Sequence, residues 1–562
     1  MAEARPPTRR RAADAVFLIA GLAALLFAWR TQAVIDNAIV YCLDAKRGTS
    51  LFHPHHVLFN AVIHWIVRGL DAIGIEADTI AVAQAHNAIF AAALIGAFAV
   101  WLARVRDARR LGAVELAAPL LLAGSSIYLE FATQPESYVP ALACAVGALA
   151  VLGNGPGRVR AGRVVIAGVL LSLAVLYHQI AVGFSILLLI QAGAAAGARR
   201  RPALREAGAA ILLGGAFTLG GYLAAHAASG TGLSFFEYCT WFLQMGQPWG
   251  VAGNVGASGL ETLGRTLALA VVGNGSETAG RVALVATGLL LAANAVAAAR
   301  SAASREPRTI CLAWAAGLLA FLWWWLPKEV NYFVFVMPPL AALAVLSIRD
   351  ACGERLARPV AIGGAAAVLA CAGVREALPH HRDPDPVRVR AAALHAIGEP
   401  GTVRICNLAT TYWLFYDFDE PDVLHVNAAM AAAQATSAPG GGRSRPHDPL
   451  REAASIAIPL IELRPDLLAE PLAALSPQDP SRPWLDFAAW LFDLREQGGQ
   501  GTRRELAVSR MANGELVVLL WNRRVPCRDM DELLAALDAG IAALSDGAAE
   551  FEFAAWKRAA AR

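Results

Sequence analysis

Long apolar runs separated by short polar stretches dominate the first two thirds of the chain. Eleven of these runs approach the roughly 20 residues that an α-helix needs to cross a bilayer. Their predicted bounds are 15–34, 79–103, 111–129, 138–154, 163–179, 180–197, 207–228, 280–299, 310–326, 331–348 and 359–375. The pattern predicts an α-helical polytopic membrane domain over residues 1–375, with about eleven spanning helices.

The apolar runs end near residue 375, and the rest of the chain has the pattern of a soluble domain. The runs "TVRICNL" and "ELVVLLW" are typical of strands, and "DMDELLAALDAGIAAL" is typical of a helix. Residues 376–562 are therefore predicted to form a small α/β domain. Composition agrees with this division, because only 17% of the whole chain is charged, against about 25% in soluble globular proteins.

Arginine-rich loops predict the orientation in the membrane. With the N-terminus in the cytoplasm, the basic loops 104–110, 158–163, 199–205, 300–308 and 349–358 all fall inside, as the positive-inside rule requires. Two weaker apolar segments, 57–67 and 260–273, then lie along the outer interface, since one extra crossing would invert the loops after it. We expect a bacterial inner-membrane protein with a periplasmic C-terminal domain. A net charge of +3 gives no indication of nucleic-acid binding.

Polar residues from five separate stretches collect at the predicted outer boundary. The first outer loop, residues 35–78, supplies two acids and the motif "HPHH", and "PESY", "YHQI" and "LPKEVNY" follow at later span ends. Ionisable groups near spans are costly, so they are functional candidates by default. The candidates are Asp36, Asp44, His53, His55, His56, Glu136, Tyr138, His178, Gln179, Lys328 and Tyr332.

Two interpretations of the "HPHH" motif stay open at this point. Imidazole is a good ligand for zinc and other transition metals. However, a tetrad that contains proline is expected to have no fixed ligand geometry, and three adjacent histidines do not easily complete a zinc site. Contacts with phosphate or sugar hydroxyls are the favoured interpretation. Two interpretations also stay open for Lys328, which is placed either to form an ion pair with Glu329 or to contact a phosphate.

These stretches together resemble the GT-C superfamily of multi-spanning glycosyltransferases. The resemblance rests on Asp36-Asn37-Ala38 after the first span, on "GTSLFHPHHVLF" where a Gly-x-x-x-x-His-Pro stretch is usual, and on "QPESYVPAL", "LSLAVLYHQIAVGF" and "LPKEVNYFVFVMPPLAAL". It covers most of the first 375 residues as architecture. It departs from the family pattern at Asn37, where a second carboxylate is frequent, and at Asn331, where an arginine is usual.

The resemblance implies transfer of a sugar from a polyprenyl-phosphate-linked donor to a glycan, lipid or protein acceptor, in contact with membrane lipid. Asp36 would act as the general base, while Lys328 and the histidines at 53, 55 and 56 would hold the lipid phosphate. Glu136 and Tyr138 would bind the sugar or orient Asp36, with His178 behind them. No cofactor is required by this scheme, and a divalent cation, Mg²⁺ or Mn²⁺, stays an open option.

Two other classes of function compete with a transferase. A transporter or flippase would place polar residues near the bilayer midplane, on broken helices, whereas here they lie at one edge. A non-catalytic scaffold that displays the C-terminal domain would not explain why polar residues from five stretches share one level. Chemistry at the outer face is the favoured prediction.

Overall fold

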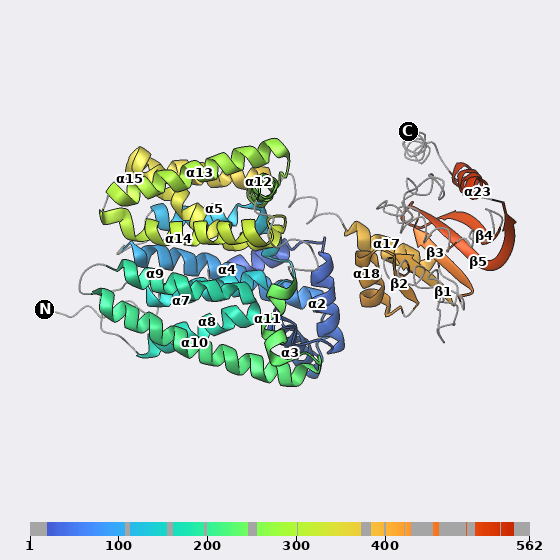
Figure 1. Ribbon diagram of the computed structural model, residues 1–562, viewed down its shortest axis with the longest axis horizontal. Coiled ribbons are helices and arrows are strands. Elements are labelled where there is room, and N and C mark those ends of the chain that lie inside the picture. The colour runs from blue at the N-terminus through green and yellow to red at the C-terminus, as the bar shows by residue number, and fades with distance from the viewer. Residues whose placement is uncertain are drawn as a thin grey trace. The chain divides into compact units, whose positions relative to one another are not determined.

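The computed structural model describes residues 20–106, 113–153, 161–195, 199–245, 256–300, 302–372, 384–397, 401–420, 422–426, 429, 453–459, 491, 501–528 and 530–544. The chain divides into two compact units, Met1–Asp383 and Pro384–Arg562. The first unit is a bundle of apolar helices, and the second is built on a β-sheet (Figure 1).

Apolar runs that were predicted to span the membrane are helical over most of their described residues, although the first run leaves the helix after residue 28. Residues 20–28 of the first run form a helix. The long helices of the bundle are α4 (Thr79–Val105), α7 (Tyr138–Leu152), α8 (Ala161–Tyr177), α9 (Phe184–Ala194), α10 (Arg200–Ser229), α13 (Glu277–Arg300) and α14 (Ala302–Trp325). A short 3-10 helix, η1 (Gln179–Gly183), leads from α8 into α9.

Three of the predicted spans differ from simple helices. Segment 111–129 contains two helices, α5 (Ala113–Ala123) and α6 (Ser126–Phe131). Segments 331–348 and 359–375 belong to the 3-10 helix η3 (Val330–Phe335) and to α15 (Met337–Ala372). Helix α15 is interrupted at Gly353, whose φ of 74° is a backbone conformation that glycine adopts without steric cost. This break lies inside the predicted polar loop 349–358.

Surface exposure of large apolar side chains agrees with a membrane location. Helices α4, α10, α13 and residues Arg305–Trp325 of α14 are long and apolar enough to cross a bilayer, by length and composition. Leu212 on α10 and Leu289 on α13 are 78% and 67% exposed, which suits a face covered by lipid better than one covered by water. The predicted α-helical polytopic architecture is confirmed, and the number of eleven crossings stays a prediction.

Four further helices gather at one end of the bundle, here called the polar end (Figure 1). They are α2 (Asp36–Arg47), α3 (Phe59–Ala72), α11 (Phe235–Met245) and α12 (Ala257–Val272). Helices α3 and α12 contain the two segments that were predicted to lie along the interface. Helix α2 packs on α3 and α4, and α12 packs on α6 and η3, so these elements cover the ends of the apolar helices.

Helices α8 and α10 touch at backbone level. A Cβ atom added to Gly214 would lie 2.9 Å from the carbonyl oxygen of Gly168, and one added to Gly168 would lie 3.0 Å from the carbonyl oxygen of Ala210. Small residues at a contact let two membrane helices approach closely, which increases van der Waals attraction between them. Any larger residue at Gly168 or Gly214 would push the two helices apart.

The buried guanidinium of Arg308 connects three helices of the bundle, α13, α14 and α15. Arg308 of α14 is fully buried, and its Nε donates to Asn294 Oδ1 of α13 at 2.9 Å. Its terminal nitrogen donates to the Leu346 carbonyl at 3.2 Å and to Asp350 Oδ2 at 2.5 Å, both on α15. Because an unpaired charge in an apolar bundle is very costly, this set of partners fixes the three helices together.

The C-terminal unit carries a five-stranded sheet with the order β2-β1-β3-β5-β4. Its strands are β1 (Thr402–Cys406), β2 (Val423–His425), β3 (Ser455–Pro459), β4 (Gly501–Arg510) and β5 (Leu516–Cys527). Strand β1 is parallel to β2 and β3, and β5 is antiparallel to β3 and β4. Helices α17 (Pro386–Ala396), α18 (Leu408–Phe418) and α23 (Met530–Ala542) complete the predicted α/β unit.

Local sequence sets where the helices of this unit begin. Asp385 precedes α17 and accepts a hydrogen bond from the Val387 amide at 2.8 Å, with Pro386 as the first helical residue. Asn407 precedes α18 and accepts from the Thr410 amide at 2.9 Å. Such N-caps satisfy amides that have no partner within the helix. The chain therefore turns from strand β1 directly into α18.

Candidate functional site

The "HPHH" motif forms a closed turn at the polar end of the bundle. The His56 amide donates to the His53 carbonyl at 3.1 Å, and the two residues pair as an isolated β-bridge. Proline at the second position of a β-turn is favourable because its φ angle is already set. The tetrad thus has a defined backbone, with Pro54 at a position that stabilises the turn, while the expectation that it has no fixed ligand geometry stays a prediction.

Three side chains from later elements hold the backbone of this turn. The Gln179 amide nitrogen Nε2 donates to the Pro54 carbonyl at 2.9 Å, and the Tyr222 hydroxyl donates to the same carbonyl at 3.2 Å. The Tyr238 hydroxyl donates to the Phe52 carbonyl at 2.6 Å. These donors come from η1, α10 and α11. The turn is thus fixed by its backbone, which leaves its imidazole rings for other contacts.

Aromatic rings from four segments form a continuous cluster around the turn. His53 stacks on His56 with ring centroids 4.6 Å apart, and His55 lies 4.3 Å from His178 at the end of α8. The cluster continues through Tyr138 at the start of α7, 4.7 Å from His178, to Tyr332 of η3, 5.4 Å from Tyr138. The structure thus brings together seven of the predicted residues: His53, His55, His56, Tyr138, His178, Gln179 and Tyr332.

Burial keeps the histidines of the turn uncharged at neutral pH. Loss of solvation lowers the pKa of His53 to about 4 and that of His55 to about 3, and it holds the pKa of His56 well below its usual range. A neutral imidazole offers a hydrogen bond or a lone pair, and not a positive charge. The expected role of these histidines as cations for a phosphate is therefore not supported by their environment.

Glu136 lies in the loop before α7 and is only 1% exposed. The loop is held by Asn87 of α4, whose side-chain nitrogen donates to the Glu136 carbonyl at 2.7 Å and to the Gln134 carbonyl. Burial raises the pKa of the Glu136 carboxyl to about 8. At neutral pH this group is mostly protonated, so it can donate as well as accept a hydrogen bond.

Unfolding measured between pH 5 and pH 8 tests the state of Glu136. Because its pKa rises from 4.5 to about 8 on folding, the folded protein keeps a proton that the unfolded chain releases. Stability is then lost as the pH rises through this window, by at most about 1.4 kcal/mol per pH unit. Glu136→Gln should remove this slope, whereas the exposed control Glu76→Gln should keep it. Equal slopes for wild type and Glu136→Gln would contradict the assignment.

Asp36, Asp44 and Lys328 lie outside the ring cluster. Asp36 is exposed in the first turn of α2, and Lys328 is exposed between α14 and η3. Asp44 is half-buried and accepts a 3.0 Å hydrogen bond from the Thr49 hydroxyl, closing the turn after α2. Asp44 thus has a local structural contact, and Asp36 is exposed on the surface of the described part of the bundle.

The segment before Asp36 is tied to the loop that carries Glu136. The Gln134 side chain donates to the Ala33 carbonyl at 2.6 Å and accepts from the Ile35 amide at 3.3 Å. Thr133 Oγ1 also accepts from the Thr31 amide at 3.1 Å. Asp36 and Glu136 therefore each follow a segment that is hydrogen-bonded to the other segment, although about one hundred residues separate the two acids in the chain.

Several residues of this region were not predicted. Tyr41 of α2 lies 4.1 Å from the His56 ring, and Trp241 of α11 lies 4.6 Å from the His53 ring. His86 of α4 bonds the Tyr177 hydroxyl at 3.0 Å. His86 and Asn87 are polar residues inside an apolar run, a signal that could have identified them. Aromatic residues such as Tyr41 and Trp241 carry no such signal, because they are common at membrane boundaries.

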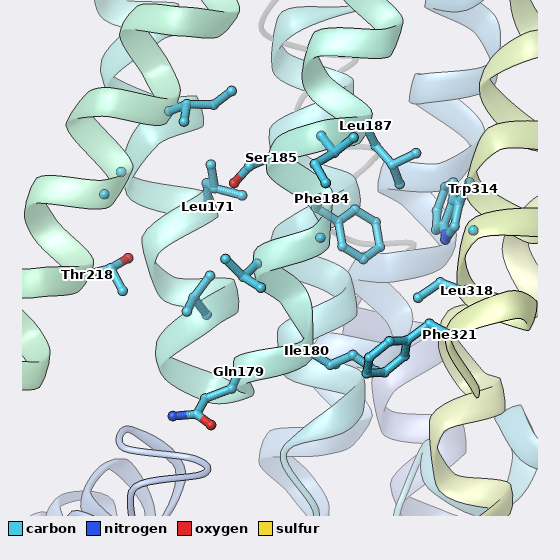
Figure 2. A pocket seen from close by; sticks show the side chains of 18 of the residues that line it. Leu171, Gln179, Ile180, Phe184, Ser185, Leu187, Thr218, Trp314, Leu318 and Phe321 are labelled. Atoms are coloured by element: carbon cyan, nitrogen blue, oxygen red, sulfur yellow. The ribbon is translucent and has the colours of Figure 1, made fainter. Parts of the chain in front are cut away.

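An apolar cavity of about 820 Å³ begins beside the turn. It lies among α8, η1, α9, α10 and α14, and its wall includes Leu171, Phe184, Leu187, Trp314 and Phe321. Figure 2 shows Gln179 at one end of the cavity, with the apolar side chains beyond it. Gln179 thus lines the cavity and also holds Pro54. This volume is near the upper limit of ordinary small-molecule pockets.

Comparison with solved structures identifies the fold. The chain is similar to the oligosaccharyltransferase of Archaeoglobus fulgidus crystallised with Zn and sulfate, with a TM-score of 0.52, 13% identity, and coverage of 93% of this chain and 77% of that one. It is also similar to the oligosaccharyltransferase AglB of the same organism in complex with an inhibitory peptide and a dolichol-phosphate (TM-score 0.50, 12% identity, 95% and 79% covered).

A third similar structure is ArnT from Cupriavidus metallidurans bound to undecaprenyl phosphate, with a TM-score of 0.49, 14% identity, and coverage of 90% and 97% of the two chains. No protein-family model and no curated protein matches the sequence. At these identities the likeness concerns the arrangement of the helices and the sheet, and it agrees with the resemblance seen in the sequence motifs. The chain is a polytopic helical membrane protein that shares its fold with the two oligosaccharyltransferase structures.

Proposed function

We propose that this protein is a membrane glycosyltransferase, which transfers a sugar from a polyprenyl-phosphate-linked donor to an acceptor at the periplasmic face of a bacterial inner membrane. The observation that carries the proposal is the apolar cavity that ends at Gln179, next to the polar ring cluster. A ligand with a long apolar tail and a polar head matches this arrangement. The similar AglB structure was solved with a dolichol-phosphate.

The two parts of such a donor find different surroundings. The prenyl chain would lie between α8, α9, α10 and α14, where leucine, isoleucine and phenylalanine side chains replace lipid. The sugar phosphate would lie at the polar end, within reach of neutral imidazoles and tyrosine hydroxyls. Lys328 is exposed at this end, and we infer that it supplies positive charge to the phosphate when the donor binds.

The transfer requires one base and one leaving group. The acceptor hydroxyl gives its proton to Asp36 while its oxygen attacks C1 of the sugar. The bond between C1 and the phosphate oxygen breaks, and polyprenyl phosphate leaves with the electron pair. A single displacement of this kind inverts the anomeric centre. The exposed position of Asp36 lets a glycan, lipid or protein acceptor reach it from the aqueous side.

Glu136 would act differently from Asp36 because its environment differs. Protonated at neutral pH, it can donate a hydrogen bond to a sugar hydroxyl or to the departing phosphate. Tyr138 and His178 lie behind it in the ring cluster and would position the sugar. A pair of carboxylates for Mg²⁺ or Mn²⁺ is not formed at the start of α2, where the exposed Asp36 is followed by the exposed amide Asn37.

Donor turnover tests the proposal. Purified wild-type protein in lipid nanodiscs is incubated with a panel of polyprenyl-phosphate sugars, and release of polyprenyl phosphate is measured by mass spectrometry. Turnover of at least one member of the panel is expected, together with no consumption of the same sugar on a nucleotide. A folded protein that neither binds nor consumes any polyprenyl-linked sugar would overturn the proposal.

A further inference from the structure

We propose that the turn formed by His53, Pro54, His55 and His56 is a binding site for zinc. One nitrogen from each of the three imidazoles can be chosen so that all three lie within 4.8 Å of one another. Ligand nitrogens of one zinc ion are separated by roughly 3.3 Å, from a bond length near 2.0 Å in a tetrahedron. Because the nitrogens lie up to 4.8 Å apart and the His53 and His56 rings are stacked, zinc binding requires these two rings to turn so that their nitrogens face a common ion.

His56 supplies the second observation. Its side chain is completely buried, and neither ring nitrogen has a hydrogen-bond partner in the described part of the chain. A buried polar atom without a partner is destabilising by about 1–3 kcal/mol, so such an atom points to a missing ligand. A metal ion between His56 and His53 would provide one.

The backbone around the ligands is already fixed. The carbonyl of Pro54 accepts from Gln179 and Tyr222, and the His55 carbonyl accepts from the Gln179 amide at 3.3 Å. These hydrogen bonds fix the backbone that carries the three imidazole rings, so the rings start from one backbone conformation before an ion arrives. His53 Nδ1 accepts a long hydrogen bond of 3.3 Å from the His55 backbone amide. If zinc binds through this nitrogen, that weak hydrogen bond is lost.

The choice of zinc follows from the ligand set. Three imidazoles without a carboxylate favour zinc and neighbouring transition metals, whereas Mg²⁺ and Mn²⁺ prefer oxygen ligands. In the described residues, the group of three or more metal-binding side chains that lie close together consists of these histidines alone. A three-histidine site leaves one tetrahedral position for water or for a ligand oxygen. The inference does not depend on the proposed glycosyl transfer.

Metal content tests the site without an activity assay. Full-length protein in detergent is stripped with chelator, equilibrated with zinc sulfate, passed through a desalting column and analysed by mass spectrometry. One equivalent of zinc is expected for wild type and for His425→Ala, a half-buried histidine of the sheet unit. His56→Ala should lose the bound zinc, and magnesium should not replace it in any variant.

Two further variants distinguish loss of a zinc ligand from misfolding of the protein. His56→Cys restores a zinc ligand and should recover metal, and His53→Ala removes a second ligand whose ring is only half-buried. Cobalt added to wild type should give the visible absorption of a tetrahedral site, which His53→Ala lacks. Wild type that retains no zinc, or zinc retained equally in His53→Ala and His56→Ala, would overturn the proposal.

Discussion

Asp36→Asn is expected to lower the rate of sugar transfer by about 10²–10⁴-fold, the usual contribution of a general base. The amide keeps the size of the carboxylate but cannot take the proton of the acceptor hydroxyl. Because Asp36 is exposed and does not line the apolar cavity, donor affinity and thermal stability should stay unchanged. The measurement is single-turnover transfer from a labelled donor, beside a direct titration of donor binding.

The matched control for this experiment is Asp71→Asn. Asp71 is an exposed carboxylate of α3 that faces Arg68 at 4.0 Å, and its removal should not change the rate. Glu136→Gln provides a second comparison within the site. Full activity of Asp36→Asn would show that the assignment of Asp36 as the base is wrong, whatever the activity of Glu136→Gln.

Filling the apolar cavity should weaken binding of a long-chain donor by about 10–100-fold. Gly317 of α14 lines the cavity, and no atom lies within 4 Å of the position that its Cβ would take. A side chain can therefore leave the backbone here without a clash at its Cβ atom, and the ring of Gly317→Phe would displace prenyl carbon whose burial is worth about 1.5–3 kcal/mol. The expected result is a higher KM and Kd for the polyprenyl donor, with kcat at saturation unchanged.

Gly288→Phe on α13 is the matched control, because Gly288 is equally open but does not line the cavity. A geranyl-phosphate donor supplies a second control, since its short chain leaves much of the cavity empty. Gly317→Phe should affect this donor less than the long one. Equal affinity of wild type and Gly317→Phe for the long donor would show that the prenyl chain binds elsewhere.

The sequence predicted the helical bundle well because burial in lipid demands long apolar runs. Segment 79–103 became α4 with an error of two residues at its end, and the two weaker segments 57–67 and 260–273 became helices at the polar end. Strands β1 and β5 followed from the runs "TVRIC" and "LVVLLW", whereas β3 and β4 were not predicted. Gly353 breaks the helix inside the predicted loop 349–358, so the described parts of segments 331–348 and 359–375 lie on either side of this break, as predicted.

The candidate site was predicted only in part. His178 and Glu136 were visible because polar residues at the ends of apolar runs are unusual, and the structure buries both beside the turn. The geometry of that turn depends on Gln179, Tyr222 and Tyr238, which come from three later elements, so no local pattern could reveal it. The cavity could not be predicted from the sequence either, because leucine and glycine occur both in cavity walls and in packed cores.

The backbone contact between α8 and α10 has a consequence for how a carrier lipid exchanges. Gly168 and Gly214 already let the two helices touch, and Gly214 is also part of the cavity wall. This contact keeps the two helices from moving closer at this point. If the cavity holds a polyprenyl carrier, as we propose, the wall formed by α8 and α10 would keep its width between one lipid and the next, and exchange of the carrier would reorder little of the protein.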